Sequence, residues 1–442
     1  MLMVGNGRLI TRSETERYLA DGCVVIDNNT IVEVGPTAGM QQKYPAARFL
    51  DARGRVIMPG LINTHMHLYS TFARGMALKD APPNDFSQIL ERLWWRLDKA
   101  LTAQDIYYSA MVPLLDCVKN GTTTIFDHHA SPGKVQDSLF TIAQACRTAG
   151  VRACLCYEVS DRDGGEVAVQ GIHENRQFIT HCQRSGDEML QGMFGLHASF
   201  TLGDSTLERC VQAAQGTGAG FHVHTAEAAA DVAHCQSHYG KRVVERLAAF
   251  DILGEKTIAG HCVHVNEAEM DLLQRSCTHV AHNPESNMGN AVGGAPVIEM
   301  MQRGIRVGLG TDGYTSDMFE SLKAANLLHK HRLQNPSAAW QEPPTMLFEH
   351  NRMFAEKYFP RAMGRIEPGA YADIIIVDYD PPTPLQADNL NGHILFGMSG
   401  RCVDTTIIHG RVVMLERQFT DIDEREVHAK ARELAADLWR RF

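Results

Sequence analysis

The fold is read from the stretch Pro59-Gly-Leu-Ile-Asn-Thr-His-Met-His67, an apolar run that follows a Pro-Gly turn and ends in two histidines. If residues 61–67 form a β-strand, the alternation of side chains places His65 and His67 on one face, close enough together to hold one metal ion. An isolated His-x-His is more often a pair of ordinary hydrogen-bonded strand residues. The rest of the chain decides between these two interpretations.

Strand-like runs of this kind recur between residues 60 and 360, with helical patterns such as 103–119, 135–149 and 321–332 between them. The runs are residues 61–67, 122–129, 151–158, 193–199, 220–227, 257–264, 279–284 and 306–313. Eight β-α units in roughly 250 residues predict an α/β fold, the closed (β/α)8 TIM barrel. The alternative is an open doubly wound sheet, which is less favoured because no Gly-x-Gly-x-x-Gly follows the first run.

Short β-type segments also occur at both ends of the chain, at 7–10, 23–26 and 30–34 and again at 372–378 and 404–414. Neither set has a second layer to cover it, so we expect them to pack together as one small β-sandwich. The expected organisation is therefore a first sandwich part over 1–58, a metal-dependent barrel over 59–365, a second sandwich part over 366–422 and a C-terminal helix over 423–442.

The predicted barrel strands end in side chains that bind metals or carry protons. These are His67, His128, His129, His197, His224, Glu227, His261, Asn283 and Asp312. The carboxyl ends of all strands in such a barrel converge on one face, where active sites lie. Unrelated core histidines would not share this register, so the pattern favours a metal centre.

Six motifs, in this order, resemble those of the amidohydrolase superfamily. They are Pro59-Gly-x-x-x-x-His65-x-His67, His224-x-x-Glu227, Gly260-His-Cys262, His282-Asn-Pro-x-x-Asn287, Leu309-Gly-Thr-Asp-Gly313 and Glu367-Pro-Gly-x-x-Ala-Asp373. The match is best with the branch of deaminases and chlorohydrolases that hold one metal ion. Within it, the segments Leu93-Trp-Trp-Arg-Leu-Asp98, Asp127-His-His-Ala-Ser-Pro132 and Phe396-Gly-Met398 are similar to those of the SsnA-type aminohydrolases.

This resemblance implies that His65, His67, His224 and Asp312 bind one divalent metal ion. Three neutral imidazoles and a carboxylate suit Zn²⁺ first, and Fe²⁺ or Mn²⁺ next. His222 competes for the place of the third histidine because it shares a strand face with His224. We prefer His224, since His222 lies deeper in the predicted barrel and has no glutamate three residues on.

The resemblance also implies a hydrolytic deaminase of an amino-substituted nitrogen heterocycle, a purine, pterin or related ring, that releases ammonia through a metal-bound hydroxide. In that chemistry Asp312 receives the water proton, Glu227 carries protons to the ring and His261 holds the hydroxide. Structural roles, a helix-start carboxylate for Glu227 and a buried imidazole for His261, are the alternatives. A chlorohydrolase, another C–N hydrolase and a catalytically inactive binding barrel are the competing functions.

Substrate contacts are expected from His197, as the resemblance implies, although the Ala-Ser that follows it departs from the usual pattern of the relatives. His128 and His129 alternate in direction, so one of them faces the barrel mouth, and His129 is our choice because it is nearer the strand end. Arg74 and residues 86–95 lie in the long loop after the first strand, where barrel enzymes place specificity residues.

The composition restricts the partners and the compartment. A net charge of −10 and a pI near 6.1 argue against nucleic acid or an anionic membrane as the main partner. The first ten residues do not resemble a signal peptide, and eleven cysteines without a Cys-x-x-Cys pair indicate reduced thiols. We therefore expect a cytoplasmic enzyme that acts on a small molecule, with a homodimer as the commonest kind of assembly.

Overall fold

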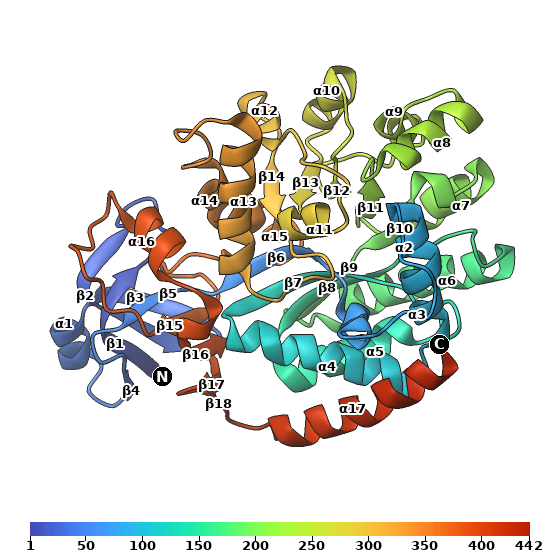
Figure 1. Cartoon of the computed structure of the whole chain (residues 1–442). Helices are drawn as coiled ribbons and strands as arrows, with labels where there is room; N and C mark the ends of the chain where they lie inside the picture. The colour runs from blue at the N-terminus through green and yellow to red at the C-terminus, as the bar shows by residue number, and fades with distance from the viewer.

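Eight parallel strands form the centre of the structure, a computed structural model that describes residues 1–442 (Figure 1). In chain order they are β6 (Leu61–Met66), β7 (Thr122–His129), β8 (Arg152–Tyr157), β10 (Phe194–Ala198), β11 (Phe221–Thr225), β12 (Ile258–His261), β13 (His279–His282) and β14 (Val307–Leu309). Successive strands pair in two sheets, and parallel bridges between Met66 and Asp312 and between Val159 and Leu196 join the sheets into a ring. The short β9 (Leu190–Gly192) pairs with β8. The predicted (β/α)8 barrel is confirmed, and each expected run contains a strand.

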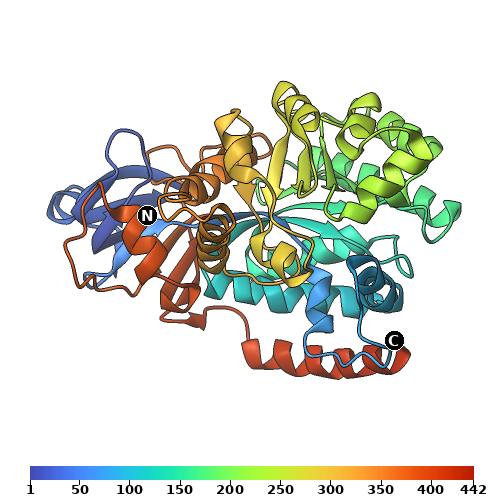
Figure 2. The same cartoon turned by 45° about the horizontal axis from the view of Figure 1, so that its top comes forward.

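Helices follow the barrel strands and cover the outside of the ring, as Figure 2 shows from a second direction. They include α4 (Ala103–Lys119), α5 (Ser138–Ala149), α6 (Gly165–Ser185), α7 (Asp204–Ala214), α8 (Ala229–Tyr239), α9 (Val243–Ala249), α10 (Glu267–Arg275), α11 (Pro284–Gly289), α12 (Val297–Gln302), α13 (Met318–Leu333), α14 (Glu342–Thr345) and α15 (Asn351–Ala355). Between β6 and α4 the chain forms α2 (Phe86–Ile89), one π-helical turn (Leu90–Trp94) and α3 (Trp95–Ala100).

Local sequence fixes where several of these helices begin. At α4, the Thr102 hydroxyl accepts from the Asp105 backbone amide, and the Asp105 carboxylate accepts from the Thr102 amide at 2.8 Å. Asn266 and Glu269 make the same reciprocal contacts at the start of α10. Each of these capping boxes satisfies amide groups that the first helical turn leaves unpaired.

Strands from the two ends of the chain form a third sheet, outside the barrel. Its members are β1 (Leu2–Ile10), β2 (Tyr18–Asp27), β3 (Thr30–Pro36), β4 (Arg48–Asp51), β5 (Val56–Pro59), β15 (Ile374–Val377), β16 (Val403–Ile408), β17 (Arg411–Leu415) and β18 (Gln418–Phe419). The two ends join directly, because β5 pairs antiparallel with β15. One cluster of 13 buried residues, which includes Val24, Ile57 and Ile376, draws side chains from both ends. Two helices, α1 (Thr37–Lys43) and α16 (Leu390–Gly397), lie beside this sheet.

Gly60 lies at the passage from the terminal sheet to the barrel. Its amide donates to the Asp373 carbonyl, and the chain then continues directly into β6. A Cβ atom at Gly60 would lie 2.3 Å from the side chain of Thr123 on β7, closer than any atom tolerates. The close approach of the two strands therefore requires glycine here.

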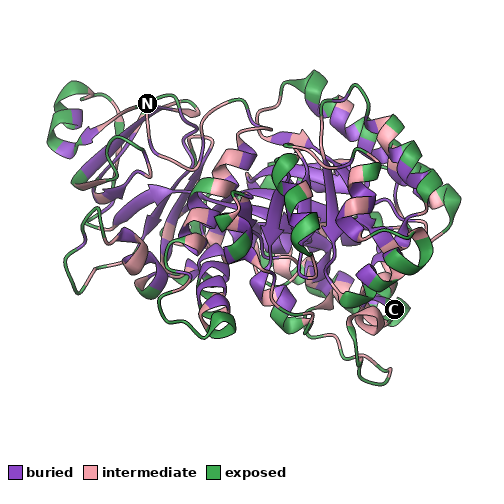
Figure 3. Ribbon diagram, turned by 90° about the horizontal axis from the view of Figure 1, so that it is seen from above, coloured by how far each residue is buried: buried purple, intermediate pink, exposed green.

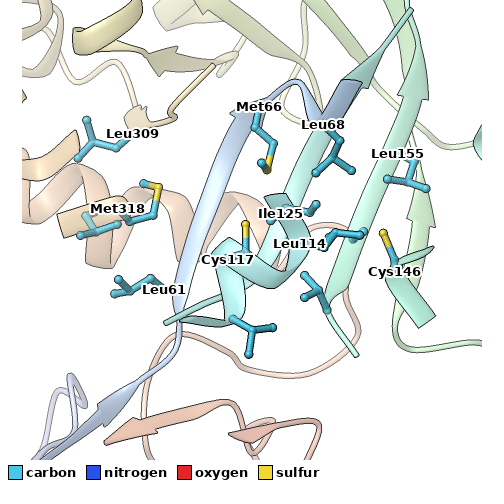
Figure 4. Packing of buried hydrophobic residues seen from close by; sticks show 14 of the residues in the cluster. Leu61, Met66, Leu68, Leu114, Cys117, Ile125, Cys146, Leu155, Leu309 and Met318 are labelled. Carbon is cyan, nitrogen blue, oxygen red and sulfur yellow. The ribbon is translucent and has the colours of Figure 1, made fainter. Parts of the chain in front are cut away.

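Buried residues concentrate in the barrel strands and on the inward faces of the helices (Figure 3). The largest hydrophobic cluster has 70 buried residues and includes the interface between the strands β6 to β8 and helices α4 and α5. Figure 4 shows part of this interface, where Leu114 and Cys117 of α4 lie beside Ile125 of β7. This packing holds the first strands of the barrel in place, and with them the histidine pair.

The C-terminal helix α17 (Glu424–Arg441) runs along the outside of the barrel, and its end lies near α3 (Figures 1 and 2). Leu434 and Leu438 are buried, and the Arg441 side chain donates to Asp105 of α4 at 2.8 Å. The structure thus places this helix on the barrel. None of the helices has both the length and the apolar character that crossing a membrane requires.

Candidate metal centre and active site

Three strand ends bring four candidate ligands together at one mouth of the barrel. His65 and His67 lie at the end of β6, His224 lies in β11, and Asp312 follows β14. The His67 Nε2 atom is 3.1 Å from His224 Nε2 and 3.1 Å from the Asp312 Oδ1 atom. His65 Nε2 is 4.0 Å from the same carboxylate oxygen. The candidate ligands belong to two overlapping groups, His65 with His67 and Asp312, and His65 with His224 and His261, in each of which the donor atoms lie within 4.8 Å of one another.

Backbone contacts hold Asp312 against the histidine strand. The amide groups of Thr311 and Asp312 both donate to the His65 carbonyl at 2.9 Å. Asp312 has a backbone φ of 53°, in the left-handed region that residues other than glycine rarely adopt. Its carboxylate accepts from the Gly313 amide at 2.8 Å and from the Ser286 hydroxyl at 2.6 Å. The strained backbone and these donors aim the carboxylate at the histidines.

Each candidate histidine ligand uses its second ring nitrogen to fix its orientation. His65 Nδ1 is 2.7 Å from His222 Nε2, His67 Nδ1 donates to the His128 carbonyl at 2.5 Å, and His224 Nδ1 donates to the His197 carbonyl at 3.0 Å. Such partners select the tautomer whose Nε2 lone pair is free for a metal.

The donor set fits a divalent metal ion. His65 Nε2 is buried and has no hydrogen-bond partner in the protein, which is costly unless another group binds it. Nitrogen ligands with one carboxylate match the preferences of zinc and of other transition metals. His222 contacts His65 and not the Asp312 carboxylate, so the structure places it behind a ligand and brings His224 to the cluster.

Two further groups lie beside the four candidate ligands. His261, at the end of β12, has its Nε2 atom 3.6 Å from Glu227 and 3.6 Å from Asp312. The amide oxygen of Asn287 accepts from His261 Nδ1 at 2.8 Å, which leaves Nε2 unprotonated and directed at the two carboxylates. His261 Nε2 has no hydrogen-bond partner in the protein. The structure thus brings the predicted proton-transfer residues within reach of the candidate metal ligands.

Burial and neighbouring charges separate the protonation states of these groups. Burial and the charge of Asp312 raise the pKa of Glu227 well above its ordinary value, which favours the protonated form of this carboxyl. Burial alone would raise the pKa of Asp312, but a hydrogen bond from His67 outweighs it and lowers that pKa. Burial lowers the pKa values of His65 and His224, which keeps both rings neutral. Burial would lower the pKa of His67, but its hydrogen bond with Asp312 outweighs burial and raises that pKa to about 9. A metal ion at His67 Nε2 would replace this proton.

A cavity of about 220 Å³ opens above the cluster. The floor includes His67, His224, Glu227 and Asp312, and the aromatic walls are Tyr69, Phe86, Trp94, Trp95, Phe200 and Tyr314. His197 also lines the cavity, with its Nδ1 atom 2.6 Å from the Thr201 hydroxyl. Aromatic walls around a few polar groups are typical of a site for a flat organic molecule.

Two of the expected substrate-binding residues do not reach this cavity. The Arg74 side chain is 64% exposed, and it pairs with Asp116 of α4 at 3.5 Å. His129 is buried beside Tyr69 and contacts the Ser131 hydroxyl at 2.9 Å. The alternation along β7 directs His128 to the barrel interior instead, with its ring centre 4.6 Å from that of His224.

Several residues of the site were not singled out in the sequence. Glu158 lines the cavity, and Ser286 orients Asp312, whereas Asn287, which orients His261, belongs to one of the six motifs. Glu158 could have been found by the pattern that identified the other strand ends, because it is a titratable residue at the end of the apolar run 151–158. Burial by itself would raise the Glu158 pKa, but His197 and a contact with His128 outweigh it and lower that pKa.

The fold and the metal site define a metal-dependent hydrolase, and the sequence comparison agrees. The amidohydrolase family model matches residues 56–413, so the chain belongs to the amidohydrolase family. A bacterial imidazolonepropionase-like composite domain also matches residues 22–47. The predicted membership is therefore confirmed, and with it the predicted enzyme class, a metal-dependent hydrolase of non-peptide C–N bonds.

Curated relatives match almost the whole chain. The 5-methylthioadenosine/S-adenosylhomocysteine deaminase of Pelotomaculum thermopropionicum is 33% identical over 445 residues, which cover 99% of this chain and 98% of the relative. The 5'-deoxyadenosine deaminase of Methanosarcina mazei is 31% identical over 441 residues, with 99% and 98% coverage.

Solved structures of similar proteins share the fold. An adenosine deaminase of Xanthomonas campestris with bound zinc has a TM-score of 0.88 at 22% identity, covering 100% of this chain and 99% of its own. The atrazine chlorohydrolase TrzN of Arthrobacter aurescens, complexed with zinc, has a TM-score of 0.81 at 22% identity, with 98% and 100% coverage. At this level of identity the likeness concerns the fold alone.

Proposed function

We propose that this protein is a hydrolytic deaminase that uses a single zinc ion and replaces the amino group of a purine-like heterocycle by oxygen, with release of ammonia. The observation that carries the proposal is the cluster of three imidazoles, Asp312, Glu227 and His261 at one mouth of the barrel, of which His67, His224, Glu227 and Asp312 line an aromatic cavity. The full-length relatives named as deaminases of adenosine derivatives support the choice of substrate class. The predicted homodimer stays a prediction.

His65, His67, His224 and Asp312 would hold the zinc ion, which when bound supplies the Lewis acidity that lowers the pKa of a water molecule. Around that position lie one group that accepts a proton and one that donates a proton. Asp312 is ionised and accepts a proton from the attacking water, whereas the protonated Glu227 donates one to the ring nitrogen beside the reacting carbon.

The proton balance requires Glu227 to act more than once. After water adds to the carbon, Asp312 passes the water proton to the amino group, which leaves as ammonia when the C–N bond breaks, and Glu227 takes the remaining hydroxyl proton and is protonated again. Glu227 lies 3.6 Å from His261 Nε2, which in turn lies 3.6 Å from Asp312, so protons have a short route from the water side to the leaving group. The His261 imidazole is unprotonated at Nε2 and accepts a hydrogen bond from the attacking water.

The proposal is tested by measuring ammonia release from adenosine, 5'-deoxyadenosine, guanine and pterin with protein of known zinc content. We expect release from at least one purine and loss of activity when zinc is removed by a chelator. A chlorinated triazine in the same screen tests the chlorohydrolase alternative, for which the likeness to TrzN supplies only the shared fold.

The variant Glu227→Gln tests the proton-transfer role. It keeps the size of the side chain but removes the acid, and loss of general acid catalysis typically costs about 100- to 10,000-fold in rate. Zinc content should stay unchanged because Glu227 is not one of the four ligands. The matched control is Glu208→Gln, a change of the same chemistry at an exposed position of α7. Wild-type turnover in Glu227→Gln would remove this residue from the mechanism.

A further inference from the structure

The cavity contains a second buried acid that the proposed chemistry does not use. Glu158 follows β8, and its side chain is 3% exposed while lining the cavity. One carboxylate oxygen is 3.2 Å from His128 Nδ1. The nearest cation to the other oxygen is Arg162, at 3.9 Å, too far for a hydrogen bond. One carboxylate oxygen of Glu158 therefore accepts no hydrogen bond from the protein.

Arg162 is held away from Glu158 by other acids. It pairs with Asp98, and its Nε atom is 3.1 Å from Asp163. Its guanidinium also lies 5.3 Å from the centre of the Trp95 ring, behind the aromatic wall. Arg162 does not line the cavity, so it neither closes the free side of Glu158 nor offers its charge to a ligand.

A second metal ion does not account for Glu158. The donor atoms of His67, His128, Glu158 and His224 lie within 4.8 Å of one another, as those of a metal site would. However, His67 and His224 use their Nδ1 atoms in hydrogen bonds to carbonyl groups, so only their Nε2 lone pairs remain. Each lone pair binds one ion, and both belong to the first site. Glu158 and His128 alone do not complete another.

The charge of the cavity wall is one-sided. Four carboxyl groups, Glu158, Glu227, Asp231 and Asp312, line it, whereas no lysine or arginine does. A phosphate or carboxylate group that entered beside the metal position would lose its water without gaining a side-chain cation. Donor groups, in contrast, would find an acceptor in Glu158. The cavity is thus suited to uncharged molecules that carry N–H or O–H groups.

We propose that Glu158 is a specificity residue that accepts a hydrogen bond from an N–H or O–H donor of the substrate, so that the enzyme acts on uncharged aminopurine bases or nucleosides and excludes nucleotides. This inference rests on the proposed deaminase function, but ligand binding tests it without turnover. Glu158, Trp95 and His197 line the same cavity. A purine ring that packs against the aromatic wall would therefore present one edge to Glu158.

The first experiment measures binding by calorimetry to the zinc-loaded protein. The probes are purine riboside, which has no amino group to lose, its 5'-monophosphate and the free purine base. We expect the riboside or the base to bind at least about 100-fold more tightly than the monophosphate, since an uncompensated like charge costs several kcal/mol. Equal or tighter binding of the monophosphate, or no binding of either uncharged probe, would overturn the inference.

The second experiment removes each N–H or O–H donor of the better probe in turn, by methylation or deoxygenation. For wild-type protein, one removal should weaken binding by about 10- to 100-fold, as expected for a hydrogen bond to a charged acceptor. In Glu158→Leu the same removal should cost no more than about 2-fold. In Glu158→Gln, which keeps a neutral acceptor and protects the fold, the cost should be intermediate.

The control is Glu166→Gln, which removes an exposed carboxylate at the start of α6. Melting temperature and zinc content are measured for every variant, to separate a specificity effect from a damaged fold. If both Glu158 variants retain wild-type affinity and wild-type donor preference, the assignment of Glu158 is wrong. If the probes bind as expected but no aminopurine releases ammonia, the deaminase proposal fails while the assignment of Glu158 stands.

Discussion

Replacing His222 should weaken metal binding although this residue is not a predicted ligand. His222 is fully buried, and its Nε2 atom lies 2.7 Å from His65 Nδ1. In His222→Leu the His65 Nδ1 atom would lose the partner that fixes the ring and leaves Nε2 free for the metal. Outer partners of metal-binding histidines typically contribute about 10- to 100-fold in metal affinity. We therefore expect the zinc dissociation constant to rise by that factor, or about 1.4 to 2.7 kcal/mol.

The assay is competition for zinc against a chromophoric chelator, with metal content measured after dialysis. His279→Leu is the matched control, because His279 is also a buried barrel histidine but neither of its ring nitrogens has a hydrogen-bond partner. Its ring stacks on Phe354, away from the metal ligands, with ring centres 4.5 Å apart. The control should therefore retain the wild-type zinc affinity.

A zinc affinity of His222→Leu within about 2-fold of wild type would refute the reasoning, since ring orientation would then not depend on this hydrogen bond. An equal loss in both variants would also contradict it, because the effect would then come from general disturbance of the barrel interior. Melting temperatures of the metal-free proteins provide the necessary comparison of folding.

Three further predictions concern packing and pH. Gly310→Ala should lower zinc affinity at least about 10-fold in the same chelator assay. The added Cβ atom would lie 2.3 Å from Asn283 and 2.8 Å from His65, so it would displace the candidate ligand. Unchanged zinc affinity would contradict this prediction. Leu438→Ala should lower the free energy of unfolding in urea by about 2 to 4 kcal/mol, because it removes a buried side chain of α17. The control Arg432→Ala changes an exposed residue of the same helix and should leave stability unchanged. Equal losses of stability in the two variants would exclude a packing role for α17. Burial and the charges of Glu320 and Asp317 raise the pKa of Glu285 to about 8, so the folded state binds the extra proton and stability falls as pH rises from about 4.5 to 8. Glu285→Gln should therefore gain roughly 5 kcal/mol relative to wild type at pH 9 compared with pH 4, because each pH unit between the two pKa values is worth about 1.4 kcal/mol. A pH-independent difference would show that Glu285 titrates normally.

Much of the site follows from strand ends, which are visible in the sequence. The carboxyl ends of parallel barrel strands meet at one face, so the last residues of the apolar runs are neighbours whatever their distance along the chain. This rule brought His65, His67 and Asp312 into one expected cluster, and the structure places them there. The same rule applies to Glu158, whose acidic side chain ends the run 151–158.

The direction of side chains beyond the regular strands did not follow from the sequence. Arg74 ends a short helical turn and extends toward Asp116, and the direction of that turn depends on its packing against α4. His128 and His129 occupy adjacent positions, and only the orientation of β7 in the closed ring determines that His128 faces His224.

The sequence by itself determined the barrel, the histidine pair at its first strand and the family, because period-two alternation and short motifs are local properties of the chain. Only the tertiary structure decided which groups orient the candidate metal ligands and which further acid lines the cavity. Those relations depend on contacts between distant segments, such as His65 with His222, and on left-handed backbone at His261 and Asp312. These contacts and this backbone conformation form only when the strands close into the barrel.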